Sequence, residues 1–290
     1  HIRLRLLPSA PEHAEEVRKT AEERLTAFLA RRPALYEEDR DNSADLYKNM
    51  YLAEYSQEQW DRDYGPQGAM PFRDNNSVHL MTYDREYSRY GGPHAMELAE
   101  THFQRSSEYV LHLVETTNVH MRTALLGQSA QLMLTLCLAF LRDEHGVAEF
   151  LTRYRTMWEN SYQESSEDQH ERFDASYTRM RDRLLRRAEQ VRDAVRGAPG
   201  AAPTEREQAW IRHAVELRDA VWRLAEEGKV TLRNGVRPEP KDALTVVLSS
   251  YVHMTNNRLG ASILDEIYLS YVLRRTLLEL APGVTEPVAS

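Results

Sequence analysis

Long segments with helical periodicity occupy most of this chain, and they constrain its fold more than any other feature. Their apolar residues recur at three- and four-residue spacing, which places them on one face of an amphipathic helix. We predict about eight helices, near residues 9–32, 93–115, 118–142, 147–162, 173–196, 204–227, 242–258 and 259–280. Segment 118–142 is largely apolar, which predicts a central position in the fold.

Short stretches that alternate apolar and polar residues predict a few strands among these helices. They are His1–Leu7, Ser77–Tyr83 and Lys229–Leu232. Because they do not alternate regularly with the helices, a doubly wound parallel sheet is disfavoured. We predict an α+β fold, in which a helix-rich single domain over residues 1–290 packs around a small, mostly antiparallel sheet.

Two interruptions divide the pattern. Residues 35–77 are polar but rich in aromatic residues, chiefly tyrosine, and we interpret them as an insertion in which residues 45–60 are helical. Its rings either form a peptide-binding surface or fix a long loop to the core. Residues 197–203, with the sequence GAPGAAP, predict an internal linker. The chain opens on His1 without a methionine, and we expect that an N-terminal part is missing.

Composition excludes several classes of function. The net charge of −8 argues against a general nucleic-acid surface, which requires a basic field. The single cysteine, Cys137, lies in an apolar run and predicts a small buried side chain. The apolar run Leu132–Leu141 is too short to cross a membrane, and no signal peptide is apparent, so we expect a cytoplasmic protein. Phosphate-binding loops, dinucleotide motifs and metal-ligand motifs are absent, and we predict neither a cofactor nor a metal site.

A histidine near the C-terminus is the first candidate for chemistry. His253 lies in the sequence YVHMTNNRLG, where helical spacing places Asn256 and Asn257 on its face. Two consecutive asparagines are unfavourable in a helix unless a side-chain network or a cap requires them. Gly260 is expected to end the helix or to bend it into the next one. From these residues alone, a structural and a catalytic histidine are equally plausible.

Arginines in two other segments are candidates for binding an anion. Arg3 and Arg5 share one face of the first predicted strand, where they either bind one ligand or form a solvated sheet edge. Arg85 and Arg89 precede a Gly-Gly turn that permits close approach of a ligand backbone. The alternative is a purely geometric turn, with its arginines paired to neighbouring acids.

Taken together and in this order, the motifs resemble the C-terminal elimination domain of class I lanthipeptide dehydratases. That domain also occurs as stand-alone proteins in thiopeptide pathways. The family pattern consists of H-x-R-x-R, then Y-x-x-E-x-x-R-Y-G-G-P, then H-M-x-x-N-R. The matching residues here are His1, Arg3, Arg5, Tyr83, Glu86, Arg89, Tyr90, Gly91, Gly92, Pro93, His253, Met254, Asn257 and Arg258.

The resemblance implies a reaction and a site. Glutamate would be eliminated from a glutamylated Ser or Thr of a precursor peptide, without a cofactor. Arg3, Arg5 and Arg89 would bind or polarise the glutamyl ester, and His253 would act as acid or base. We place the substrate-binding residues at Arg85, Tyr90, Asn256, Asn257 and Arg258.

Two alternatives to elimination remain. A stand-alone relative in thiopeptide pathways performs a formal [4+2] aza-cycloaddition of two dehydroalanines, which builds a pyridine and expels the leader peptide. A non-catalytic module that binds a leader peptide is the second. The expected partners are a precursor peptide with its leader and a separate glutamylating subunit, with no nucleic acid and no membrane. The oligomeric state, including a homodimer, is left open.

Overall fold

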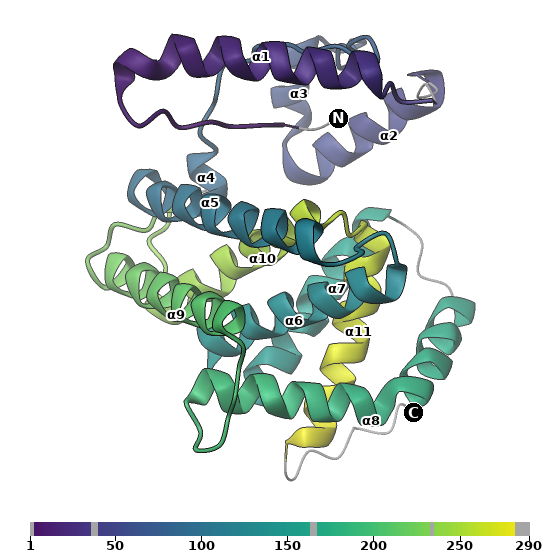
Figure 1. The fold of residues 1–290 in the computed structure, drawn as a ribbon, viewed down its shortest axis with the longest axis vertical. Helices are drawn as coiled ribbons and strands as arrows, with labels where there is room; N and C mark the ends of the chain where they lie inside the picture. The colour runs from purple at the N-terminus through teal and green to yellow at the C-terminus, as the bar shows by residue number, and fades with distance from the viewer. Residues whose placement is uncertain (1–2, 36–39, 163–166, 233–234, 282–290) are drawn as a thin grey trace. The chain divides into compact units, whose positions relative to one another are not determined.

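The computed structural model describes residues 3–35, 40–162, 167–232 and 235–281 (Figure 1), so that His1 of the first motif lies outside the described residues. Two compact units divide the chain, with unit 1 covering His1–Asp84 and unit 2 covering Arg85–Ser290. Each is described by itself. Within the described residues both units consist of helices and irregular segments, without a strand.

Unit 1 contains a short 3₁₀ turn and three helices, which are η1 (Pro11–His13), α1 (Ala14–Arg31), α2 (Arg40–Glu54) and α3 (Gln57–Tyr64). Its aromatic residues gather around Trp60, which is the one buried hydrophobic side chain among the described residues of this unit. The ring of Tyr51 lies 5.2 Å from that of Trp60, and the ring of Tyr64 lies 4.7 Å from it. These rings therefore pack on one another. Tyr36 of the same segment lies outside the described residues.

Unit 2 is a bundle built around one apolar helix. Its helices are α4 (Tyr87–Tyr90), α5 (Pro93–Thr116), α6 (Arg122–Leu141), α7 (Glu144–Tyr162), α8 (Glu167–Arg196), α9 (Glu205–Glu226), α10 (Pro240–Leu259) and α11 (Ile263–Leu280). Helix α6 packs against α7, α8, α9, α10 and α11, as Figure 1 shows. The predicted central position of residues 118–142 is thus confirmed, and Cys137 within them is buried as predicted.

Helix α6 extends beyond the apolar run Leu132–Leu141 towards the N-terminus and has 20 residues. By length and composition alone it would pass for a membrane span, but 61% of the relevant window is buried inside the structure. Such burial is typical of a core helix. The helix ends at Arg142, whose backbone has the left-handed conformation.

The predicted α+β class is wrong. Of the three predicted strands, residues 3–7 and Ser77–Tyr83 run without a ladder of backbone hydrogen bonds, and the two segments meet where the Arg5 guanidinium lies 4.8 Å from the ring centre of Tyr83. Lys229–Leu232 is irregular too, although Thr231 N–H donates to Gly91 O at 2.9 Å. Alternation makes a segment suitable for a strand, but a strand forms only where a second backbone pairs with it.

A tight connection joins the last two helices. Helix α10 ends at Gly260, whose φ of 84° is left-handed, and α11 begins after the cap residue Ser262. The Ser262 side chain accepts from Asp265 N–H, and the Asp265 carboxylate accepts from Ser262 N–H, which makes a reciprocal capping box. This connection brings the C-terminal turns of α10 beside the first turn of α11.

Replacing Gly260 with alanine is expected to destabilise the protein by about 1 kcal/mol, because an L-residue is strained at this φ. A Cβ atom there would meet no heavy atom within 4 Å, so backbone conformation alone sets the loss. The control is Gly127→Ala on the exposed side of α6, which should stabilise by roughly 0.5–1 kcal/mol. Urea denaturation measures both values. Equal effects of the two substitutions would contradict the prediction.

Candidate functional site

The His253 side chain lies between three helices of unit 2. It projects from α10 towards the first turn of α11, and the ring of Trp158 on α7 lies 4.9 Å from its own ring. The side chain is 16% exposed, so the imidazole is largely enclosed and still reaches the surface. A histidine with this exposure can exchange a proton with a bound molecule while its orientation stays restricted.

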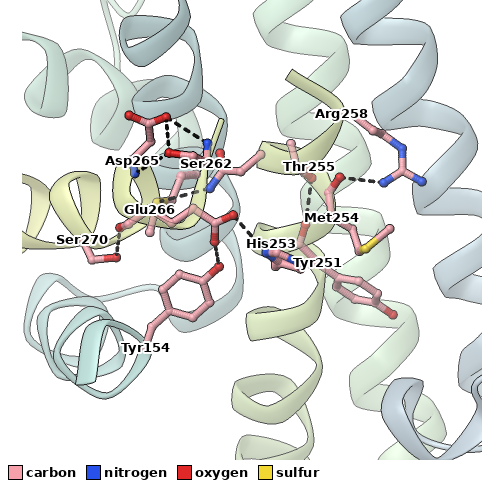
Figure 2. Close-up of polar contacts among 12 residues, drawn as sticks. Tyr154, Tyr251, His253, Met254, Thr255, Arg258, Ser262, Asp265, Glu266 and Ser270 are labelled. Atoms are coloured by element: carbon pink, nitrogen blue, oxygen red, sulfur yellow. Dashed lines mark hydrogen bonds and ion pairs between the residues drawn. The ribbon is translucent and has the colours of Figure 1, made fainter. Parts of the chain in front are cut away.

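A buried carboxylate holds this histidine. Glu266 Oε1 lies 3.0 Å from His253 Nδ1, and the Glu266 side chain is fully buried. The second oxygen of Glu266 accepts a hydrogen bond from the hydroxyl of Tyr154, a buried residue of α7 (Figure 2). Both oxygens of the carboxylate are therefore engaged, one by the imidazole and one by the phenol.

The surroundings of the Glu266 carboxylate compensate for its burial. Glu266 lies in the first turn of α11, where the partial positive charge of the helix N-terminus stabilises an anion. Burial and the neighbouring Glu266 carboxylate raise the pKa of Tyr154 well above its ordinary value, so its hydroxyl stays protonated and donates. An unpaired carboxylate would be strongly unfavourable here, and these contacts compensate for the lost hydration.

The contact also selects one tautomer of the imidazole. Since a carboxylate only accepts, the nitrogen that faces it must carry the proton, which makes Nδ1 the donor. Nε2 then holds a free electron pair, and no described residue forms a hydrogen bond with it. A neutral histidine in this state, held by a carboxylate, can accept a proton from a substrate.

The neighbours of His253 on α10 point in different directions. Asn256 is fully buried, and its amide nitrogen lies 4.0 Å from the sulfur of Met133 on α6, whereas Asn257 is exposed. Arg258 turns towards α5, where its Nε donates to Ser107 Oγ at 2.9 Å. The three residues are neighbours on one helix, as their spacing predicts, but they differ in burial, and a common binding role for them stays a prediction.

The Gly-Gly turn packs closely against other residues of unit 2. Gly91 has a φ of 88°, and a Cβ atom there would lie 3.1 Å from Val230 and 3.2 Å from Ala95. Arg85 forms a two-pronged ion pair with Glu100 at 2.8 and 2.9 Å, rather than with the adjacent Asp84. The glycines therefore serve close packing within unit 2.

The other predicted residues of the same motif lie around α4. Arg89 is partly exposed and forms a long ion pair of 3.8 Å with Glu86. Tyr90 is buried, with its ring 5.2 Å from that of Phe103 and 6.4 Å from that of Tyr251. Arg89 is thus partly enclosed, and Tyr90 belongs to the core.

Arg3 and Arg5 belong to unit 1, and both are exposed. Arg5 lies over Tyr83, so the first motif contacts the first residue of the second motif within this unit. The assembly of Arg3, Arg5, Arg89 and His253 around one substrate stays a prediction. In the described part of the chain, no three His, Cys, Asp or Glu side chains are placed to hold a metal ion.

Sequence reasoning missed Glu266 and Tyr154. A signal for Glu266 was present, because positions 266, 270, 273 and 277 lie on one face of α11 and all four are buried. A buried acid on such an apolar face needs a hydrogen-bond or charge partner. Helix capping accounts for Asp265 but not for Glu266. No comparable signal identifies Tyr154, since a tyrosine on an apolar helix face is ordinary in a core.

Comparison with known proteins decides the family. The sequence model of the family described as lantibiotic biosynthesis dehydratase C-term matches residues 1–277. The chain belongs to this family. The resemblance drawn from the motifs is therefore confirmed, and the family assignment makes the chain an enzyme of the biosynthesis of ribosomally made peptide antibiotics. Curated proteins gave no match.

A solved structure shares the fold. The pyridine synthase TbtD from thiomuracin biosynthesis has a TM-score of 0.68 and 18% sequence identity, over 94% of this chain and 82% of that chain. At this identity the likeness concerns the fold.

Proposed function

We propose that this family member eliminates glutamate from glutamylated Ser or Thr residues of a precursor peptide. The products are dehydroalanine from Ser and dehydrobutyrine from Thr. The observation that carries the proposal is the partly exposed His253 imidazole, with Nδ1 held 3.0 Å from the buried Glu266 carboxylate. Elimination requires a base for a weakly acidic Cα proton, and this arrangement supplies one.

In the proposed step His253 Nε2 takes the Cα proton. The electron pair of the C–H bond forms the Cα–Cβ double bond, the Cβ–O bond breaks, and glutamate leaves as a carboxylate. Negative charge grows first on the peptide carbonyl oxygen and then on the leaving group. A guanidinium group remains charged and can donate two parallel hydrogen bonds to a carboxylate. We propose that Arg3, Arg5 and Arg89 stabilise these oxygens in this way.

A second candidate function is supported by the fold similarity to a pyridine synthase. That reaction would join two dehydroalanines in a formal [4+2] cycloaddition and expel the leader peptide. It involves no glutamate, so a set of three arginines would lack a carboxylate to bind. The full motif set therefore favours elimination.

Mass spectrometry with two peptides tests the proposal. One peptide is glutamylated at Ser, and the other already carries two dehydroalanines. We expect the wild-type protein to release glutamate from the first peptide and to leave the second unchanged. Conversion of the second peptide to a pyridine macrocycle with free leader, and no reaction of the first, would replace elimination by cycloaddition. Inertness towards both, with binding retained, would favour the leader-binding module.

A further inference from the structure

We infer that Glu266 is a positioning residue that keeps His253 in the tautomer protonated at Nδ1, and that Tyr154 keeps Glu266 in place. This inference rests on the proposed function for its catalytic meaning. The claim that one carboxylate sets one tautomer concerns only the side chains of His253, Glu266 and Tyr154, and it does not depend on the reaction. Figure 2 shows the Glu266 carboxylate joined to the imidazole on one side and to the phenol on another.

The position of Glu266 supports a specific role. A fully buried acid could serve helix capping, but in α11 that task belongs to Asp265, which completes the capping box with Ser262. Asp265 also pairs with Arg122 from the start of α6. Glu266, one residue further, is turned away from these partners and is bound through its side chain to His253 and Tyr154. Its two oxygens therefore serve the site rather than the cap.

The phenol is needed because a carboxylate with one partner could rotate. The Tyr154 hydroxyl donates to Oε2, which leaves Oε1 directed at the imidazole. The Tyr154 ring also packs against Trp158 at 6.1 Å, and Trp158 is the residue that lies beside the His253 ring. One helix, α7, thus fixes the carboxylate through its tyrosine and the imidazole through its tryptophan.

Glutamine at position 266 reverses the hydrogen bond. Its amide can accept from Tyr154 through oxygen and donate to the imidazole through nitrogen, which makes Nδ1 an acceptor and moves the proton to Nε2. A histidine protonated at Nε2 cannot take the substrate proton there. Replacing the carboxylate that orients a catalytic histidine by an amide reduced the rate about 10⁴-fold in a serine protease.

Nitrogen NMR of ¹⁵N-histidine-labelled protein tests the inference without any substrate. The spectrum of His253→Gln identifies the resonances of His253 among the eleven histidines. We expect protonated Nδ1 and unprotonated Nε2 in the wild type, and the reverse in Glu266→Gln. Tyr154→Phe should broaden or partly reverse the pattern, because Glu266 would lose its second partner.

The matched control is Asp265→Asn, which also converts an acid to an amide in the first turn of α11. It is expected to lower stability through the cap and to leave the His253 tautomer unchanged. A wild-type spectrum with protonated Nε2, or an unaltered tautomer in Glu266→Gln, would overturn the inference. So would the same tautomer change in both variants.

Rates of glutamate release separate this inference from the proposed function. If the wild type releases glutamate, Glu266→Gln should slow the release about 10²–10⁴-fold, with a smaller change in KM than in kcat. If the wild type releases none, the proposed function fails, whereas the tautomer result still decides the role of Glu266. If Glu266→Gln reverses the tautomer but leaves kcat unchanged, the tautomer claim stands and its importance for catalysis is disproved.

Discussion

Replacing His253 with glutamine is expected to slow glutamate release by about 10²–10⁴-fold, which is the usual contribution of a positioned general base. Glutamine keeps a donor for the Glu266 carboxylate, so the buried acid retains a partner and the fold should persist. What is lost is the imidazole Nε2 that accepts the Cα proton in the proposed step. Peptide binding, measured by fluorescence anisotropy, should stay within a few-fold of the wild type.

A second His→Gln substitution, at an exposed position, tests whether the effect is specific to His253. His112 is exposed on α5, and His112→Gln should leave the rate of glutamate release unchanged. Mass spectrometry over a time course gives both rates. Full activity of His253→Gln would place the base elsewhere, and loss of peptide binding together with activity would indicate a binding role for His253 instead.

Acidification below about pH 6.5 is expected to destabilise the protein through a second pair of histidines. His102 is fully buried on α5, where its Nδ1 lies 3.0 Å from Nε2 of His213 on α9. Its Nε2 faces the Thr255 hydroxyl at 3.0 Å and the Tyr251 carbonyl oxygen at 3.3 Å. Both ring nitrogens of His102 thus contact neutral groups. None of the contacts described for this ring is with a carboxylate that would stabilise a positive charge.

Burial lowers the pKa of His102 to about 3 and that of His213 to about 4. The unfolded chain then binds protons at each histidine below about pH 6.5 while the folded chain does not. The free energy of unfolding therefore falls as pH falls through this window. His102 should contribute about 1.4 kcal/mol per pH unit, or roughly 2–3 kcal/mol between pH 6.5 and 4.5. His213 is partly exposed and should contribute less.

His102→Gln is expected to reduce this slope by about 1.4 kcal/mol per pH unit, because glutamine can bond to Thr255 but does not titrate. The control is Ser106→Ala, one turn further on α5, which removes a buried hydroxyl that donates to the His102 carbonyl oxygen. It should lower stability equally at every pH. Urea denaturation at several pH values between 4.5 and 7.5 provides the comparison, and equal slopes in wild type and His102→Gln would disprove this origin.

The helices of unit 2 could be predicted because each has a continuous apolar face. Segment 93–115, for instance, agrees with α5 (Pro93–Thr116), since Pro93 marks its start and its buried residues recur at helical spacing. The strands could not be predicted in the same way. Whether residues 3–7 become a strand depends on a second backbone, and alternation within one segment does not reveal whether that backbone is there.

The site shows the same division. His253 and Gly260 were identified from a local motif, and their local roles, a histidine near a helix end and a glycine that terminates it, are found in the structure. Helix α10 runs through His253, Asn256 and Asn257 as predicted, but packing against α6 buries Asn256 and leaves Asn257 exposed, which the local spacing does not reveal. Tyr154 contacts Glu266 across 112 positions of sequence, and no local pattern encodes such a contact.

The two side-chain hydrogen bonds of Glu266 join it to residues at very different separations in the sequence. His253 and Glu266 are 13 positions apart and meet across the Gly260 turn, whereas Tyr154 and Glu266 are 112 positions apart. The first contact requires only a helical hairpin, and the second requires that α7 has docked. A partly folded chain would thus contain the histidine and its carboxylate but not the phenol that holds them in place, so the site is complete only after α7 has docked.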